Sequence, residues 1–305
     1  MKAPGKSYRK GITIIELLKM FPDDRTAENW FEKQRWPDGP VCPECGSMEH
    51  IHANHKTMRY RCKETRCRQF FSVKKGSIME GSNIKLQHWA IAIYMVATGL
   101  KGVSSLKLHR ELGITQKSAW FMLQRIRESF ETGHLELSGE VEVDETYIGG
   151  KKKKEIRGRG PVGKAPVVGA KQRKGKVVVK PMKRTTSKAL TEFVEDTIHP
   201  DSTIYTDNYR GYWQLRAEYN HQVVRHSVSE FVRDQAHTNG IESFWALLKR
   251  GFHGTHHHFS VKHLNRYVQE FAGRYNIREM DTDAQMSAIV KNMDGKRLRY
   301  EDLIA

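Results

Sequence analysis

Apolar and polar positions along this chain predict helices in its first half and a mixture of strands and helices in its second half. Residues 11–21 form an amphipathic segment, and residues 85–98 carry an apolar stripe at helical spacing that should end at Gly99. From about residue 140 the period of the pattern shortens to two, as is typical of strands that bury one face. The chain is therefore expected to combine a helical part with an α/β part.

The second half has the element order of an RNase H-like core. An alternating strand in SGEVEVDETYIGG is followed by two strands joined by a Lys/Gly turn in 164–182. A helix over 185–198, a short strand in 202–207 and a later acidic helix from about residue 238 complete the order. In such a core the first carboxylate lies within a strand, the second at the end of a neighbouring strand, and the third on a later helix.

The spacing of apolar residues and capping residues predicts a helix-turn-helix in the middle of the chain. Ser104 or Ser105 caps one helix, Gly113 ends it, and Thr115 caps a second helix that runs to about Ser129. The second helix of such a motif enters the major groove of DNA. The residues expected to be exposed on it, and so to contact DNA, are Gln116, Lys117, Gln124, Arg125 and Arg127. Ordinary helical hairpins share this pattern.

All four cysteines lie in one window, as Cys42, Cys45, Cys62 and Cys67. They form two pairs, Cys42 with Cys45 and Cys62 with Cys67, separated by a short hairpin. Two such pairs can place four thiolates around one zinc ion, which predicts a zinc ribbon. This zinc is expected to be structural, because four thiolates leave no open coordination position. Two disulfides are the alternative, and a ribbon can also serve as a protein docking module.

The charge balance points to a polyanionic partner. The chain has 52 Lys and Arg against 35 Asp and Glu, a net charge of +17, which attracts phosphate backbones. The longest apolar stretch, residues 89–100, is about half of a membrane span. The N-terminus lacks a signal peptide's apolar core, so a cytoplasmic, nucleoid-associated protein with reduced thiols is expected.

Several unusual segments, occurring in a consistent order, resemble the bacterial insertion-sequence transposases of the DDE type that carry an N-terminal zinc ribbon. These are RWPDGPVCPECGS, YRCKETRCRQFFSVKKGSIME, VDETYIGGK, YTDNYRGY and HTNGIESFWALLKRGFHGTHHHFS. The resemblance covers roughly residues 15–278. It implies an enzyme that binds the ends of its own mobile element, cuts a DNA strand and joins the 3′-hydroxyl to target DNA.

The same resemblance implies that Asp144, Asp207 and Glu242 are the catalytic triad, and 34 residues separate the last two. Three such carboxylates hold two divalent ions about 4 Å apart. Magnesium is the expected ion, with manganese as an alternative. Lys249, seven residues after Glu242, should share its helix face and contact substrate DNA. Asn239, one turn earlier, is an alternative third ligand, because some members of this family use an Asn there.

Two further groups stand beside the first Asp. Glu142 and Glu145 flank it, and Glu142, which shares the predicted face of Asp144, is interpreted as a supporting or structural acid. Lys151 and Lys152 begin a Gly- and Lys-rich stretch that is a candidate DNA clamp, with a solvated charge run as the alternative.

We therefore expect an α+β multidomain transposase with an N-terminal zinc ribbon, a helix-turn-helix middle and an RNase H-like domain with a mixed sheet flanked by helices. The predicted boundaries are 1–80 for the N-terminal helix and ribbon, 81–134 for the helical region, 135–278 for the catalytic domain and 279–305 for a polar tail. Its partners would be double-stranded DNA, as element ends and target, and a second copy in a homodimer or larger assembly. A DNA-binding regulator without catalysis and a structure-selective nuclease are the competing functions.

Overall fold

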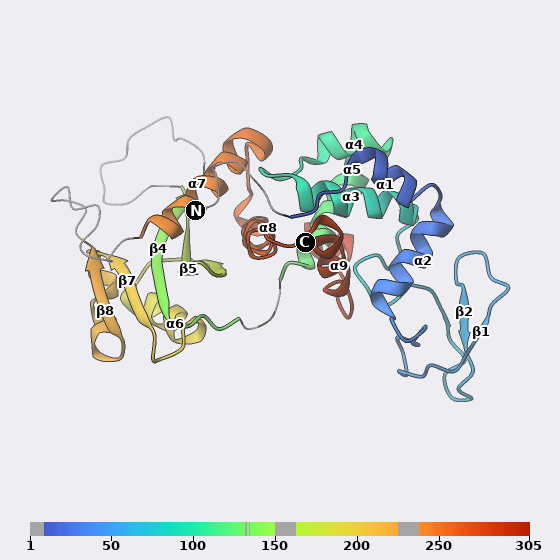
Figure 1. The fold of residues 1–305 in the computed structure, drawn as a ribbon, viewed down its shortest axis with the longest axis horizontal. Coiled ribbons are helices and arrows are strands. Elements are labelled where there is room, and N and C mark those ends of the chain that lie inside the picture. Colours follow the sequence, from blue (N-terminus) through green and yellow to red (C-terminus); the bar gives the residue numbers. More distant parts are fainter. Residues whose placement is uncertain (1–8, 132, 134, 150–162, 225–237) are drawn as a thin grey trace. The chain divides into compact units, whose positions relative to one another are not determined.

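The computed structural model describes residues 9–131, 133, 135–149, 163–224 and 238–305, which form two compact units (Figure 1). The first, called here the helical unit, comprises residues 1–130 and 277–305. The second, the sheet unit, comprises residues 131–276. No helix in these described ranges has the length and apolar character needed to cross a membrane.

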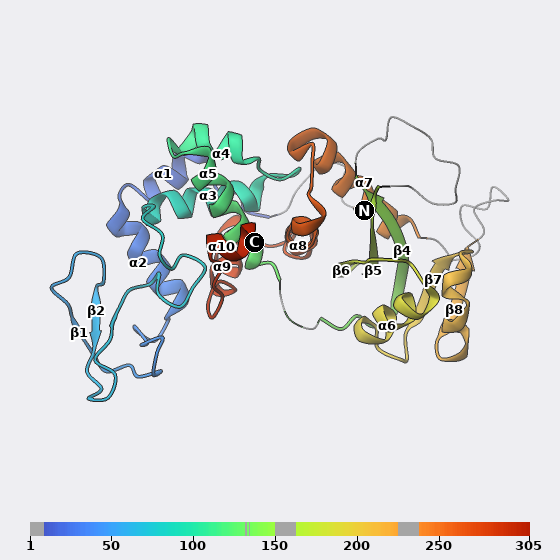
Figure 2. The ribbon, with the colours of Figure 1, turned by 180° about the vertical axis from the view of Figure 1, so that it is seen from behind.

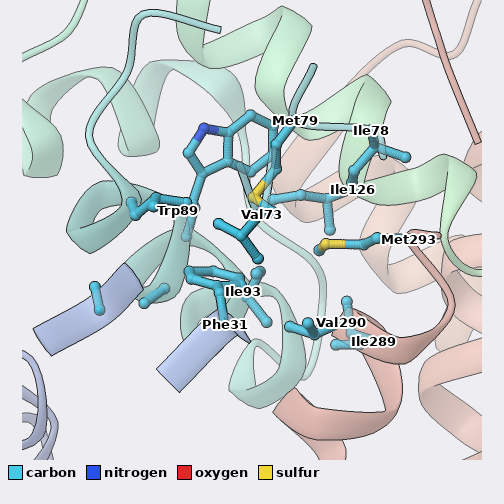
Figure 3. Packing of buried hydrophobic residues seen from close by; sticks show 14 of the residues in the cluster. Phe31, Val73, Ile78, Met79, Trp89, Ile93, Ile126, Ile289, Val290 and Met293 are labelled. Carbon is cyan, nitrogen blue, oxygen red and sulfur yellow. The ribbon is translucent and has the colours of Figure 1, made fainter. Parts of the chain in front are cut away.

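The helical unit contains seven helices and a small sheet in its described residues. Its elements are α1 (Ile14–Met20), α2 (Asp24–Arg35), β1 (His50–His52), β2 (Tyr60–Cys62), β3 (Phe70–Phe71), α3 (Leu86–Thr98), α4 (Ser105–Leu112), α5 (Gln116–Glu128), α9 (Thr282–Lys291) and α10 (Tyr300–Ile304). The three strands pair antiparallel in the order β1-β2-β3. The core of this unit collects side chains from distant segments, including Phe31 of α2, Trp89 of α3 and Ile126 of α5 (Figure 3).

The C-terminal segment 279–305, for which the sequence predicted only a polar tail, contains α9 and α10 (Figure 2). Ile289 of α9 and Met293 just after it are buried in the same core (Figure 3). Further along, Tyr300 packs edge-on against Phe121 of α5 with ring centroids 5.4 Å apart. The segment is thus part of the helical unit's core.

The capping pattern of the predicted helix-turn-helix is confirmed. The Ser104 side chain accepts the backbone N–H of Lys107 at the start of α4, and the Thr115 side chain accepts that of Ser118 at the start of α5. Between them, Gly113 ends α4 in the left-handed conformation, with a φ of +63°.

The sheet unit is built on a five-stranded mixed sheet in the order β6-β5-β4-β7-β8. Its elements are β4 (Glu140–Ile148), β5 (Ala165–Gln172), β6 (Val177–Pro181), α6 (Ser187–Thr197), β7 (Thr203–Asp207), η1 (Arg210–Ala217), β8 (Asn220–Val224), α7 (Asn239–Gly251), η3 (Phe252–His256), η4 (Val261–His263) and α8 (Leu264–Asn276). Strands β4, β5 and β6 are antiparallel neighbours, whereas β7 and β8 run parallel to β4. This is the RNase H-like arrangement expected from the element order.

Alternation along the strands gives each face of the sheet its own apolar core. Val141 and Val143 of β4 lie in a cluster with side chains of α6 and η1. Ile148 of β4 and Val167 of β5 lie in a second cluster with α7 and α8. Because side chains alternate between faces, Asp144 belongs to the face covered by α7.

Candidate active site and zinc site

Strand register brings the first two predicted carboxylates together. The last paired residues of β4 and β7 are Glu142 and Tyr205, and two positions further along each strand lie Asp144 and Asp207. Burial raises the pKa of Asp144 from its usual 3.8 to about 7, and the charges of Glu145 and Asp207 contribute to the rise. A buried carboxyl among other acids is costly unless a cation neutralises the cluster.

Helix α7 lies directly on this cluster. The indole N–H of Trp245 donates to Oδ2 of Asp144 at 3.0 Å. This close approach depends on Gly169, the residue opposite Asp144 on β5, where an added Cβ would lie 2.7 Å from the Trp245 ring. The sequence suggested only a core role for Trp245, and the structure adds a hydrogen bond to the first candidate ligand.

The third predicted carboxylate, Glu242, lies in the first turn of α7, three residues before Trp245. Its side chain is exposed and accepts a hydrogen bond from Oγ1 of Thr238 at 2.8 Å. Asn239, the alternative third ligand, is exposed at the first position of α7, and Lys249 is exposed near its end.

The three carboxylates do not form one tight cage. Among the described residues, only the four cysteines bring three or more His, Cys, Asp or Glu ligand atoms within 4.8 Å of one another. Asp144, Asp207 and Glu242 are therefore spaced more widely than that. The oxygen donors are of the kind that Mg²⁺ and Mn²⁺ prefer.

Glu142 anchors α7 to β4. Its side chain is 1% exposed, and Oε2 accepts the backbone N–H of Ile241 at 2.8 Å. Arg173 approaches the other oxygen at 3.4 Å, and Lys171 is the residue opposite Glu142 on β5. A buried carboxylate at a helix N-terminus also interacts favourably with the helix dipole. The supporting role predicted for Glu142 thus has a structural basis: it fixes the start of α7 one residue before Glu242.

We expect Gly240→Ala to lower the free energy of unfolding by about 1–3 kcal/mol, because overpacking forces a close-packed site to shift. An added Cβ at Gly240 would lie 2.7 Å from Oε2 of Glu142 and 2.9 Å from Nζ of Lys171. Gly254→Ala is the matched control, since a Cβ there meets nothing within 4 Å. Urea unfolding followed by circular dichroism measures both variants, and equal midpoints would contradict this account.

Glu145 points to the opposite face of the sheet from Asp144 and is held by η1. Oε2 of Glu145 accepts a hydrogen bond from the hydroxyl of the fully buried Tyr212 at 2.7 Å. Burial raises the pKa of Glu145, and the charge of Asp207 adds to this. Strand alternation predicts that Glu145 and Asp144 lie on opposite faces, and the hydrogen bond from Tyr212 holds Glu145 on its own face.

The four predicted zinc ligands come together in the helical unit. The Sγ atoms of Cys42 and Cys67 are 3.7 Å apart, and those of Cys45 and Cys62 are 3.6 Å apart. A tetrahedral site with Zn–S bonds of about 2.3 Å requires S–S separations of roughly 3.8 Å. Disulfide bonds would bring the sulfurs to about 2 Å, and all four cysteines are free thiols. The thiol geometry therefore fits one tetrahedral zinc ion.

Part of the predicted DNA-contact set on α5 is not exposed. Gln116 and Lys117 are exposed at the start of the helix, as expected. Gln124, Arg125 and Arg127 are buried, so the expectation that they are exposed is wrong.

The C-terminal segment explains part of this difference. The Arg125 guanidinium donates to the carbonyl of Leu298 and lies over the ring of Phe121. These contacts hold the guanidinium inside the helical unit, away from an exposed helix face. The predicted clamp residues Lys151 and Lys152 lie outside the described residues.

Comparison with known proteins gives a consistent picture. Residues 136–276 match the family model described as ISXO2-like transposase domain, and residues 22–69 match the one described as transposase zinc-ribbon domain. An uncharacterised protein in transposable element ISH50 of Halobacterium salinarum is 29% identical over 280 residues, which cover 85% of this chain and 93% of that protein.

A second relative is an uncharacterised transposase-like protein of Haemophilus influenzae, 32% identical over 98 residues. These cover 31% of this chain and 76% of that protein. Among solved structures, a pre-cleavage Mos1 transpososome aligns with 69% of this chain and 80% of its own at 11% identity. Its TM-score of 0.26 is too low to establish a shared fold.

Proposed function

Since this chain belongs to the insertion-sequence transposase family that joins a transposase zinc ribbon to an ISXO2-like transposase domain, we propose that it cuts DNA strands at its element's ends and joins them to target DNA. The observation that carries this proposal is the partly buried carboxylate pair of Asp144 and Asp207, in which the pKa of Asp144 is raised to about 7. A non-catalytic regulator has no need for such a pair.

Asp144, Asp207 and Glu242 would hold the two divalent ions, Mg²⁺ or Mn²⁺. When bound, such ions activate the attacking water or 3′-hydroxyl and stabilise the leaving oxygen of an in-line phosphoryl displacement. Trp245 orients the Asp144 carboxylate through its indole N–H. Glu142 fixes the first turn of α7 and so the position of Glu242.

DNA binding would be shared by both units. Gln116 and Lys117, exposed at the start of α5, are the proposed contacts of the helix-turn-helix. Lys249, exposed on α7, is the proposed contact of the catalytic helix. The four cysteines would hold a structural Zn²⁺, and joining two element ends to one target calls for a homodimer or larger assembly.

The identity of the third ligand is tested by two substitutions on α7. We expect Glu242→Gln to reduce strand transfer on the order of a thousandfold, because losing an ionic ligand removes several kcal/mol of transition-state stabilisation. Asn239→Ala should reduce it less than about tenfold. The assay incubates the protein with labelled element ends, target DNA and Mg²⁺. The reverse order of effects would transfer the role to Asn239, and cutting without joining would make the protein a nuclease.

A further inference from the structure

The exposed face of η1 carries an aromatic side chain between two guanidinium groups. η1 is a 3₁₀ helix over Arg210–Ala217, and residues three apart in such a helix lie directly above one another. Arg210, Trp213 and Arg216 have this spacing and are all exposed, Trp213 to 47%. The guanidinium carbons of the two arginines lie 5.5 and 6.0 Å from the centre of the Trp213 ring. We call these three residues the Arg–Trp–Arg stripe.

The opposite face of η1 ties the stripe to the carboxylate cluster. Tyr212, next to Trp213, is fully buried and donates to Glu145 at 2.7 Å. Just before η1, the backbone N–H of Tyr209 donates to Oδ1 of Asp207 at 3.0 Å. The stripe is therefore held on a short, anchored element that starts three residues after the candidate metal ligand Asp207.

The composition of the stripe fits a polyanion with aromatic bases. Within the described part of the sheet unit, neither Arg210 nor Arg216 forms an ion pair, so two positive charges face outward. A half-exposed tryptophan face is a surface on which a base can stack, and such stacking tolerates any base. Phosphates that follow the base along a strand would meet the guanidinium groups.

We propose that the Arg–Trp–Arg stripe binds a DNA strand beside the scissile phosphate, with an unpaired base stacked on Trp213 and phosphates on Arg210 and Arg216. This inference rests on the proposed transposase function and extends it to a strand-binding surface on η1. A purely local role, in which the arginine stems only cover the indole, would leave DNA binding unchanged when the stripe is altered.

Binding of two probes tests the proposal in the full-length protein without divalent metal. Both are labelled duplexes of the element end, one fully paired and one with a short unpaired 3′ strand. Trp213→Ala should weaken binding of the unpaired probe about tenfold and of the paired probe much less, and Trp213→Phe should restore most of the loss. Circular dichroism of each variant, together with this rescue, separates lost stacking from a misfolded unit.

The arginines are tested by salt dependence. Replacing Arg210 and Arg216 by Ala should lower the slope of log Kd against log salt by about two, because each phosphate contact releases counterions. The matched control removes the same charge at Lys174 and Lys176, exposed in the β5–β6 turn. That turn lies at the other end of the sheet, where Gln172 is opposite Val141 at the start of β4.

The outcomes distinguish a failure of the stripe proposal from a failure of the proposed transposase function. If the unaltered protein does not cut or join element ends in Mg²⁺, the proposed function fails. If it does, but the stripe variants bind both probes like the lysine control, the stripe is not a strand-binding surface. Equal losses with Trp213→Ala and Trp213→Phe, or equal losses on both probes, also overturn stacking.

Discussion

Asp144→Asn is expected to reduce strand cleavage and joining on the order of a thousandfold or more and, above pH 7 in the absence of Mg²⁺ and Mn²⁺, to raise the free energy of unfolding. The activity is lost because the amide is a weaker ligand for a hard cation than a carboxylate. Stability is gained because the variant no longer buries a negative charge beside Glu145 and Asp207. Asn keeps an oxygen that can accept the Trp245 indole N–H.

The pH dependence of stability follows from the direction of the shift. The pKa of Asp144 is raised from its usual 3.8 to about 7 in the folded protein. Between these values the folded state binds more protons than the unfolded state, so the stability contribution is complete below pH 4 and is lost as pH rises through about 7. The difference between variant and parent should therefore be small at pH 4 and reach a few kcal/mol above pH 7, at about 1.4 kcal/mol per pKa unit.

Thermal unfolding in buffer without added Mg²⁺ or Mn²⁺ at several pH values, which leaves the zinc in place, paired with a strand-transfer assay, measures both effects. Asp201→Asn is the matched control, because Asp201 is an exposed acid in the turn before β7. It should change neither the activity nor the pH dependence. An inactive Asp144→Asn protein that is also less stable at pH 8 would mean that the carboxylate supports the fold. An active Asp144→Asn protein would mean that Asp144 is not a catalytic ligand.

Local pattern in the sequence predicted the strand positions of two candidate site residues, whose catalytic role stays a prediction. Alternation in β4 placed Asp144 on a definite face, and the short strand ending at Asp207 runs parallel beside it, as the RNase H-like order requires. The cysteine spacing likewise predicted the clustering of the four thiols, because two closely spaced cysteine pairs can place their sulfurs around one point in few ways.

The features that the sequence did not predict depend on contacts between distant segments. From the sequence, Gly240 is only a residue with weak helix propensity. In the structure, Glu142, about a hundred positions earlier, fills the space beside it. The burial of Arg125 likewise depends on Leu298, in a segment whose composition suggested a tail. Periodicity within one segment carries no information about such partners.

Removal of zinc has the second large expected effect, the unfolding of the ribbon. The three ribbon strands contain only three, three and two residues, which is too little pairing to hold a sheet without further support. The thiols supply that support, and for small zinc modules apparent metal binding amounts to roughly 10–16 kcal/mol of folding free energy. Tyr60 and Phe71 join the ribbon to the core of the helical unit, so part of its apolar packing should remain.

We therefore expect about one zinc ion per chain by elemental analysis and none after Cys62→Ser, which replaces a buried thiol. Limited trypsin digestion should then cut rapidly at Lys63 and Arg66, while fragments of the sheet unit stay protected. His52→Ala is the control, because His52 lies between the cysteine pairs and is exposed. Zinc retained by Cys62→Ser, or lost by His52→Ala, would mean that the ion is held by a different set of ligands.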